Sequence, residues 1–509
     1  MSILSEKAAA RRRRLTTESA IKAFFGSNAL VAIVVLALIT IFLFREGFGF
    51  FGQNLANLRL YRRAGLEYVD IVRAQAQTHA ALSRQLSEIR LQEARMLPTG
   101  SSVEAFDQFA GAFSDSGEFL NALVSDANDQ AVALREALIA AGAPSAVSSA
   151  EAQPATETVA PVDPRTAMTA LRSADDKFPK IAEAMKAKID NLLAAPPVLN
   201  ASRAQRSFES WKKKTRDYLA QFPAVPQRLR EWSPDEPVPA YRAITTFLFG
   251  ANWITASFWQ DWYGIIPLLV GSIMVAAVAL FLAVPLGVCS AIYVSEVAAR
   301  GEKSLIKPYI EFISAIPSVV LGFFGIAVVG QAVRALSQMP FMKWVPFFPI
   351  SERLNVFTAG SLLALMAVPT IFTLAEDALR NVPRGFKEAS YALGANRLQT
   401  IARVLVPASL SGIISAVLLG LGRVIGETMV VLLCAGNRIA IPDFTQGLGA
   451  FFQPVHTMTG IIAQEMGEVV RGSIHYRALF MVGLVLFALT LGINYLAQRL
   501  VARYRMSIG

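Results

Sequence analysis

The sequence has few of the residues that build metal and disulfide sites. Among 509 residues there are only 2 cysteines and 3 histidines. Cys289 and Cys434 lie in apolar runs without CxxC spacing, so a disulfide framework and a zinc site are both excluded. The histidines, His79, His456 and His475, show no metal-ligand spacing. We therefore expect no metal and no cofactor.

The motifs of common enzyme sites are missing as well. There is no GxxxxGK segment followed by Ser or Thr, the dipeptide GK does not occur, and no GxSxG elbow is present. The first motif cradles nucleotide phosphates and the last presents a nucleophilic serine. We expect no catalytic residue and no ATPase site in this chain.

Charged residues are also scarce, at 17%, whereas hydrophobic residues reach 54%. The charges are unevenly placed, because residues 46–245 hold 23 Lys plus Arg and 24 Asp plus Glu. The rest of the chain is apolar and basic, and the formal net charge of the whole chain is +10. Six apolar runs are long enough to span about 30 Å of hydrocarbon. They cover residues 24–44, 264–294, 309–333, 356–375, 408–436 and 476–498.

The cations mark one side of this membrane protein. They cluster beside the apolar runs, as expected for charges that face lipid and set topology rather than for a nucleic-acid surface. The basic head, the loops after the second and fourth runs and the tail all fall on one side. Lys and Arg are retained on the cytoplasmic side. This pattern predicts cytoplasmic termini and places residues 46–263 outside.

The piece outside the membrane has helical patterning. We expect helices over residues 54–97, from Ser101 to about Gly142, and over 165–195 and 200–222, with a mobile linker at 142–164. The predicted fold is an all-α membrane protein with a helical extracytoplasmic domain between the first and second spans. Its expected parts are a head at 1–23, a first span at 24–45, the domain at 46–240 and a membrane domain at 241–505. The domain is either a spacer or docking platform, or a ligand site.

A charged loop between the fourth and fifth runs carries a recognisable spacing. Residues 378–412 contain Glu388, Ala389, Gly394 and Pro407, and two short helices joined at a glycine fit them. The spacing resembles the EAA loop of ABC importer permeases, with Ser390, Val404 and Val406 as conservative departures. The resemblance implies that this loop docks into a separate ATP-binding subunit.

Further segments resemble the phosphate ABC transporter permease of the PstC type. They include AIPSVVLGFFGI at 315–326, VPTIFTLAEDALRNVP at 368–383 and LGLGRVIGETMVVLLCAGN at 419–437. The resemblance implies an inner-membrane subunit that imports phosphate with a dimer of ATP-binding subunits, a PstA-type permease and a periplasmic phosphate-binding protein. A PstA-type subunit and a sulfate or molybdate permease are the nearer alternatives. A membrane sensory receptor is more remote, because no cytoplasmic signalling module is visible.

Two opposite charges lie inside the fifth run. Arg423 and Glu427 are four residues apart, which places them on one face of a continuous helix. Charges at membrane depth need a polar surrounding, so they form either a structural ion pair or part of an anion pathway. A guanidinium matches phosphate oxygens, and a carboxylate can accept a phosphate O–H. Ser318, after Pro317, and Thr428 are candidates for the same pathway, or for plain helix packing.

Overall fold

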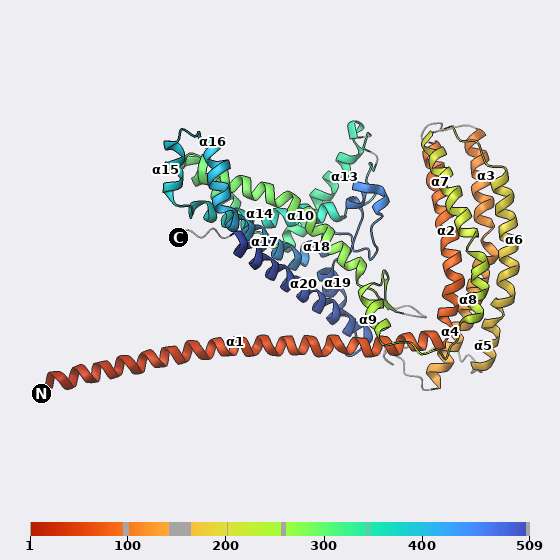
Figure 1. Cartoon of the computed structure of the whole chain (residues 1–509), viewed down its shortest axis with the longest axis horizontal. Helices are drawn as coiled ribbons and strands as arrows, with labels where there is room; N and C mark the ends of the chain where they lie inside the picture. Colours follow the sequence, from red (N-terminus) through yellow and green to blue (C-terminus); the bar gives the residue numbers. More distant parts are fainter. Residues whose placement is uncertain are drawn as a thin grey trace. The chain divides into compact units, whose positions relative to one another are not determined.

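A computed structural model of the chain describes residues 2–94, 101–141, 164–200, 202–255, 261–342, 344–345 and 347–504. Contacts divide the chain into two compact units (Figure 1). The membrane unit comprises residues 1–51, 244–255 and 262–509. The inserted unit comprises residues 52–243 and 256–261. The linker expected at 142–164 lies outside the described residues, apart from Pro164, which begins a helix.

Within the described residues, 6 helical segments are long and apolar enough to cross a membrane, which confirms the predicted number of spans. The helices that carry them are α1 (Ser2–Arg63), α10 (Ile266–Ile292), α12 (Ser318–Phe324), α13 (Gly330–Gln338), α14 (Val356–Arg380), α17 (Val406–Gly426) and α20 (Ile474–Tyr504). The shorter elements between them are α9 (Tyr241–Leu248), β1 (Trp253–Ile254), β2 (Trp262–Tyr263), α11 (Arg300–Ile313), α15 (Arg384–Ala392), α16 (Arg397–Thr400), α18 (Met429–Cys434) and α19 (Met458–Glu465). The two strands pair antiparallel, with Trp253 opposite Tyr263.

Helix α14 lies at the centre of the membrane unit and packs against α10 and α17. Close approach depends on glycine. A Cβ at Gly287 of α10 or at Gly420 of α17 would lie 2.8 Å from the side chain of Ile371 on α14. Helices in lipid associate through such small residues because no hydrophobic effect drives them together. The apolar part of α1, by contrast, is uncovered, with 0% of its most apolar window buried.

Two of the predicted spans are interrupted. The run at 309–333 is wrong as a single helix, because α11 ends at Ile313 and α12 begins after Pro317. Proline has no N–H to continue a helix and disfavours helical torsions in the residue before it. The run at 408–436 is also divided, between the end of α17 and the start of α18.

The inserted unit is a bundle of helices that run side by side (Figure 1). They are α2 (Leu66–Ala94), α3 (Ser101–Asp115), α4 (Glu118–Ala140), α5 (Pro164–Arg172), α6 (Ala174–Ala194), α7 (Ser202–Leu219) and α8 (Val225–Glu231). The core is aromatic. Trp211 is 1% exposed and has its ring centroid 5.0 Å from that of Phe113 and 5.4 Å from that of Phe208. The predicted helical character of this region is confirmed.

Two expected helices of this unit contain turns that the sequence reading missed. The helix expected over 54–97 is broken between α1 and α2, where Gly65 has a φ of +76°. The helix that follows Ser101 is broken at Ser116–Gly117, between α3 and α4. A Cβ at Gly117 would lie 2.3 Å from the ring of His79, so the buried imidazole occupies the space that a side chain there would need.

Candidate functional site

The break between α17 and α18 is the first feature of the candidate site. Helix α17 ends at Gly426, and Glu427 is extended, with φ −75° and ψ 133°. The Glu427 carboxylate accepts a hydrogen bond from the N–H of Met429 at 3.1 Å, so it caps the first turn of α18. Backbone groups at membrane depth must find partners inside the protein or line an aqueous cavity. At the break, the Glu427 carboxylate supplies such a partner for the N–H of Met429.

Arg423 lies in the last turn of α17, and Glu427 directly follows this helix as its capping residue. Arg423 is exposed and donates through Nη1 to Thr370 Oγ1 of α14 at 3.3 Å. Between these two described residues there is no ion pair within 4.0 Å. A guanidinium has five N–H donors in a planar fork, so Arg423 retains open donors inside an apolar helix.

The two candidate hydroxyls lie at other helix starts. Thr428 is the residue before α18 and is half-buried. Ser318 is half-buried and opens α12, which packs against α18. The two helices approach closely, because Cys434 Sγ of α18 contacts the carbonyl oxygen of Gly322 of α12 at 3.3 Å. No hydrogen bond joins Ser318 to Arg423 or Glu427 in the described part of the chain.

Sequence reasoning missed the hydroxyls that contact the charged pair. Thr370 accepts from Arg423, and Thr459 of α19 donates to the carbonyl oxygen of Glu427 at 3.0 Å. These partners are 53 and 32 positions away along the chain. The only available signal was their polarity within apolar surroundings, which many packing threonines share.

The charged loop forms two helices at an angle. Helix α15 contains Glu388 and Ala389, and Gly394 follows it with a φ of +80°. Asn396 then begins α16 with a capping box, in which its side chain accepts from the N–H of Gln399 and the Gln399 side chain accepts from the N–H of Asn396. Glycine is favoured at a helix end of this kind because it adopts positive φ without strain.

A buried hydroxyl pair holds the two loop helices together. Ser390 Oγ and Thr400 Oγ1 lie 2.9 Å apart, and the two residues are 8% and 0% exposed. Ser390 is one of the departures from the EAA pattern, and its hydroxyl has a specific partner here. A π-helical turn over Ile401–Leu405 leads into α17, and Pro407 lies in the first turn of α17.

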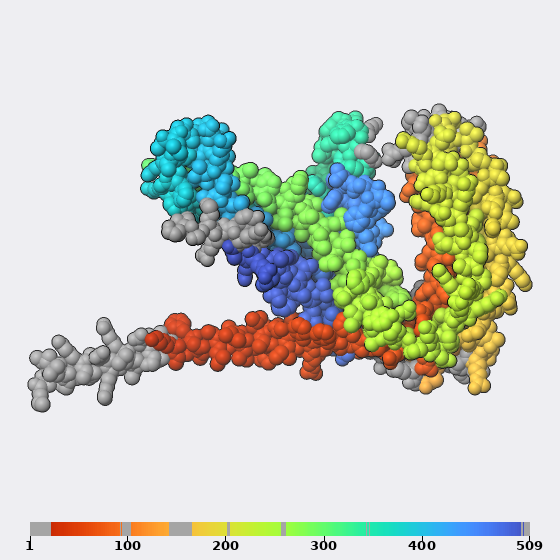
Figure 2. Space-filling view, viewed as in Figure 1, coloured from red at the N-terminus to blue at the C-terminus, as the bar shows by residue number. Residues whose placement is uncertain are grey.

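The loop is anchored to Glu296 and also has exposed apolar residues. Lys387 Nζ lies 2.7 Å from Glu296 Oε1, and Arg397 donates to the carbonyl oxygen of Glu296. Two leucines of the loop are uncovered, since Leu393 is 89% exposed and Leu398 is 74% exposed. Figure 2 shows the segment from α15 to α16 as a knob at one end of the membrane unit. Exposed leucines on a rigid knob suit a contact with another protein.

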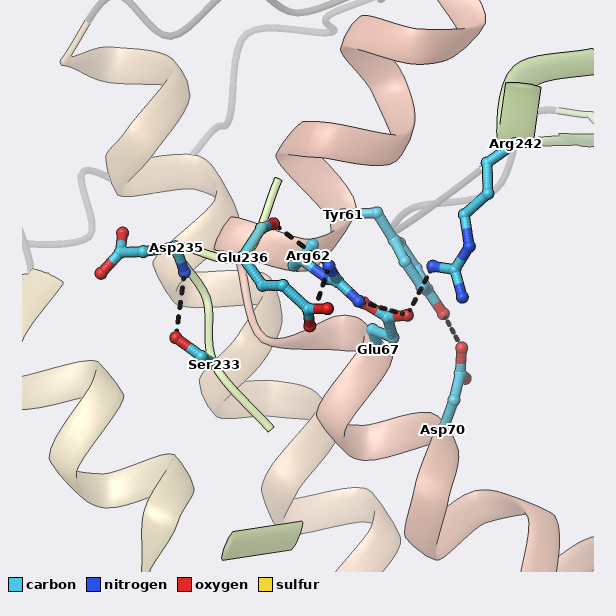
Figure 3. A network of polar contacts seen from close by, with 8 residues as sticks. All are labelled: Tyr61, Arg62, Glu67, Asp70, Ser233, Asp235, Glu236 and Arg242. Carbon is cyan, nitrogen blue, oxygen red and sulfur yellow. Dashed lines mark hydrogen bonds and ion pairs between the residues drawn. The ribbon is translucent and has the colours of Figure 1, made fainter. Parts of the chain in front are cut away.

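The inserted unit contains a cavity of about 360 Å³. Arg62, at its wall, is 7% exposed and lies between Glu67 Oε2 at 2.5 Å and Glu236 Oε2 at 3.2 Å (Figure 3). Burial opposes ionisation of Glu67, but hydrogen bonds from Arg62 and Arg242 outweigh it and hold the pKa of this carboxyl below its usual value. Because the Arg62 guanidinium is occupied by these carboxylates, this network ties the bundle together rather than presenting an open anion site.

Among the described residues, no group of three or more His, Cys, Asp or Glu could hold a metal ion. The candidate site is therefore made of a helix break beside a guanidinium with open donors, together with a separate charged loop. Neither part contains a nucleophile with an activating base.

Comparison with known proteins shows which family this chain is similar to. Residues 283–506 match the family described as binding-protein-dependent transport system inner membrane component. A probable ABC transporter permease of Bacillus subtilis, YqgH, is 36% identical over 258 residues, which are 50% of this chain and 77% of that protein. The phosphate transport system permease protein PstC of Haemophilus influenzae is 31% identical over 277 residues, which are 51% of this chain and 84% of that protein. The solved MetNI methionine ABC transporter is 19% identical, covers 47% of this chain and 94% of its own, and has a TM-score of 0.34.

The matched region contains the loop knob and the helix break. A permease of this kind is not itself catalytic, and it works in an importer with an ATP-binding subunit and a binding protein. Together with the apolar helices, this makes the protein a multi-pass inner-membrane protein. On the identity and coverage of these relatives, the chain belongs to the family of binding-protein-dependent transport system inner membrane components, as an ABC importer permease of the PstC type.

Proposed function

We propose that this chain forms part of the pathway by which an ATP-driven importer translocates inorganic phosphate. The observation that carries the proposal is the 31% identity to a phosphate permease over 84% of that protein's length. The open guanidinium of Arg423 supports it, because a planar fork of donors pairs well with phosphate oxygens.

In this proposal the substrate passes the break between α17 and α18. Arg423 meets the phosphate charge, and Glu427 accepts its O–H through the carboxylate oxygen that does not cap α18. Thr428 and Ser318 offer hydroxyls at neighbouring helix starts. A protonated oxyanion suits this set better than sulfate, which has no proton to donate at neutral pH.

The coupling partner is a dimer of ATP-binding subunits, which we place on the knob formed by Glu388, Ala389 and Gly394, ahead of Pro407. A PstA-type permease completes the membrane pathway, and a periplasmic phosphate-binding protein delivers the substrate. The exposed leucines of the knob and its anchoring to Glu296 support the docking role.

We place the chain termini in the cytoplasm and the inserted unit outside. Two exposed positions test this in a variant without Cys289 and Cys434: Lys188→Cys in α6 and Leu393→Cys in the knob. A maleimide that does not cross membranes is expected to label the first in intact spheroplasts and the second only in inside-out vesicles. The reverse pattern would overturn the orientation.

The substrate is tested by uptake of labelled phosphate in cells that lack their own phosphate permeases and express the whole importer. Excess unlabelled phosphate is expected to abolish uptake of the label, and sulfate and molybdate are expected to leave it unchanged. Import of labelled sulfate or molybdate with no phosphate uptake would identify a permease for another oxyanion and contradict the proposal.

A further inference from the structure

The carbonyl group of Glu427 needs a partner that the helix does not supply. In a continuous helix it would accept from the N–H four residues later, but α18 restarts at Met429. Its partner is the hydroxyl of Thr459, which donates at 3.0 Å. Thr459 is 9% exposed. An unsatisfied carbonyl at this position would be costly, because little water reaches it.

The protons of this hydroxyl chain can be placed from its acceptors. A threonine hydroxyl has one proton to donate, and Thr459 gives its proton to the Glu427 carbonyl, which can only accept. Thr457 Oγ1 lies 3.3 Å from Thr459 Oγ1. Because the Thr459 proton is already used, Thr457 must be the donor in this hydrogen bond. Thr457 Oγ1 in turn accepts from the N–H of Gly460 at 3.1 Å. Every proton in this short chain therefore points toward Glu427.

The same segment is fixed to the core helix α10. The N–H of Met458 donates to Ser272 Oγ of α10 at 2.9 Å. The backbones are close here, since a Cβ at Gly271 would lie 2.1 Å from the carbonyl oxygen of His456. His456 is 2% exposed and accepts from the N–H of Thr457 at 3.0 Å. The start of α19 is thus a rigid link between α10 and the break.

We propose that Thr459 is a positioning residue for Glu427, linking the carboxylate of the phosphate pathway to helix α10 through Ser272. The proposal rests on the proposed function, because it assigns Glu427 to the pathway. It predicts that removing one hydroxyl from α19, outside the six spans, misplaces Glu427 and slows translocation while the complex still assembles.

The test compares three variants of the full importer in proteoliposomes. Thr459→Val removes the hydroxyl and keeps the shape, and Thr459→Ser keeps the hydroxyl. Thr490→Val is the matched control, because Thr490 of α20 also donates to a carbonyl oxygen, that of Phe487, at 2.9 Å. Phosphate import and ATP hydrolysis are measured together and divided by the amount of assembled complex.

Thr459→Val is expected to lower phosphate import per complex about tenfold, as an unsatisfied buried carbonyl warrants, and to lower the phosphate imported per ATP hydrolysed. Thr459→Ser is expected to restore both, and Thr490→Val to change neither. A role in stability alone would reduce assembly and leave the ratio at its wild-type value, which would overturn the proposal. A serine variant as impaired as the valine variant would also overturn it.

If the valine variant does not assemble, Ser272→Ala decides the question. It removes the acceptor on α10 and is expected to lower the same ratio, and a wild-type ratio would reject the link. The wild-type complex in the same assay separates this inference from the proposed substrate. If it imports another oxyanion instead, the phosphate assignment fails, and the comparison of variants is made with that anion.

Discussion

The two units of the chain pack their helices by different means. In the membrane unit, Gly287 and Gly420 let two helices approach α14 so closely that the Ile371 side chain takes the space that a Cβ would need. In the inserted unit, Trp211 lies among aromatic rings, and charges such as Arg90 and Asp107 pair on the surface. Water drives apolar burial in the inserted unit, whereas lipid does not. The membrane unit therefore depends on shape and on satisfied polar groups, and it holds the candidate site.

This difference predicts that changes in the membrane unit affect transport more than folding. The largest effect is expected for Gly394→Asp in the knob. Its positive φ costs a non-glycine residue about 1–2 kcal/mol, and an unpaired charge buried at a subunit contact costs about 3–5 kcal/mol. The strain is present with or without the partner, but the buried charge alone corresponds to more than a hundredfold loss of affinity for the ATP-binding subunit. Copurification of that subunit and phosphate uptake are both expected to disappear.

Gly472→Asp is the matched control for the knob variant. Gly472 also has a positive φ, of +82°, and has nothing within 4 Å of its Cβ position. It shares the backbone strain and lies outside the knob. Equal losses in both variants would mean that strain rather than docking causes the effect.

In the inserted unit we expect the opposite, namely that substitutions affect folding more than transport. Trp211→Ala removes a side chain that is 1% exposed and whose Nε1 donates to the carbonyl oxygen of Leu82 at 3.0 Å. Such a truncation costs about 3–5 kcal/mol of unfolding free energy. Hydrogen exchange of α2 and α7 amides in the full chain should accelerate accordingly. Phe119→Ala, at a ring that is 66% exposed, should leave exchange unchanged, and protection retained in the Trp211 variant would contradict the assigned core.

The apolar runs and the loop spacing predicted the spans and the knob. They succeed because a span needs only length and hydrophobicity, and because the loop helices follow local signals at Gly394 and Asn396. The breaks at Pro317 and Glu427 were missed, since a hydropathy window averages over a single non-helical residue. The partners of Arg423 and Glu427 were missed because tertiary packing, rather than sequence proximity, selects Thr370 and Thr459.

The smallest expected effect is a pH dependence confined to the inserted unit. His79 is 3% exposed and stacks on Phe113, with ring centroids 4.6 Å apart. Burial lowers its pKa below the usual 6.5, so the folded state binds fewer protons than the unfolded state. Stability is therefore complete above pH 6.5 and falls as the pH drops toward the folded pKa. Denaturation followed by tryptophan fluorescence should show this slope.

His79→Phe should flatten the slope below pH 6.5, because the ring can still stack but cannot titrate. The lost contact with the Ser114 carbonyl oxygen is long, at 3.4 Å, so the cost at neutral pH is expected to be about 1 kcal/mol or less. A slope equal to that of the wild type would show that other groups cause it.

The most direct test of the phosphate pathway is uptake by Arg423→Gln, normalised to assembled complex, beside Arg334→Gln as an exposed arginine of α13. Loss of a charge-assisted hydrogen bond worth about 1.5–3 kcal/mol predicts roughly 10- to 100-fold slower phosphate uptake with unchanged assembly. Because Arg423 and Glu427 form no ion pair, the double variant Arg423→Gln with Glu427→Gln should remain as slow. Wild-type uptake in either Arg423 variant would contradict the pathway and leave these residues with a structural role alone.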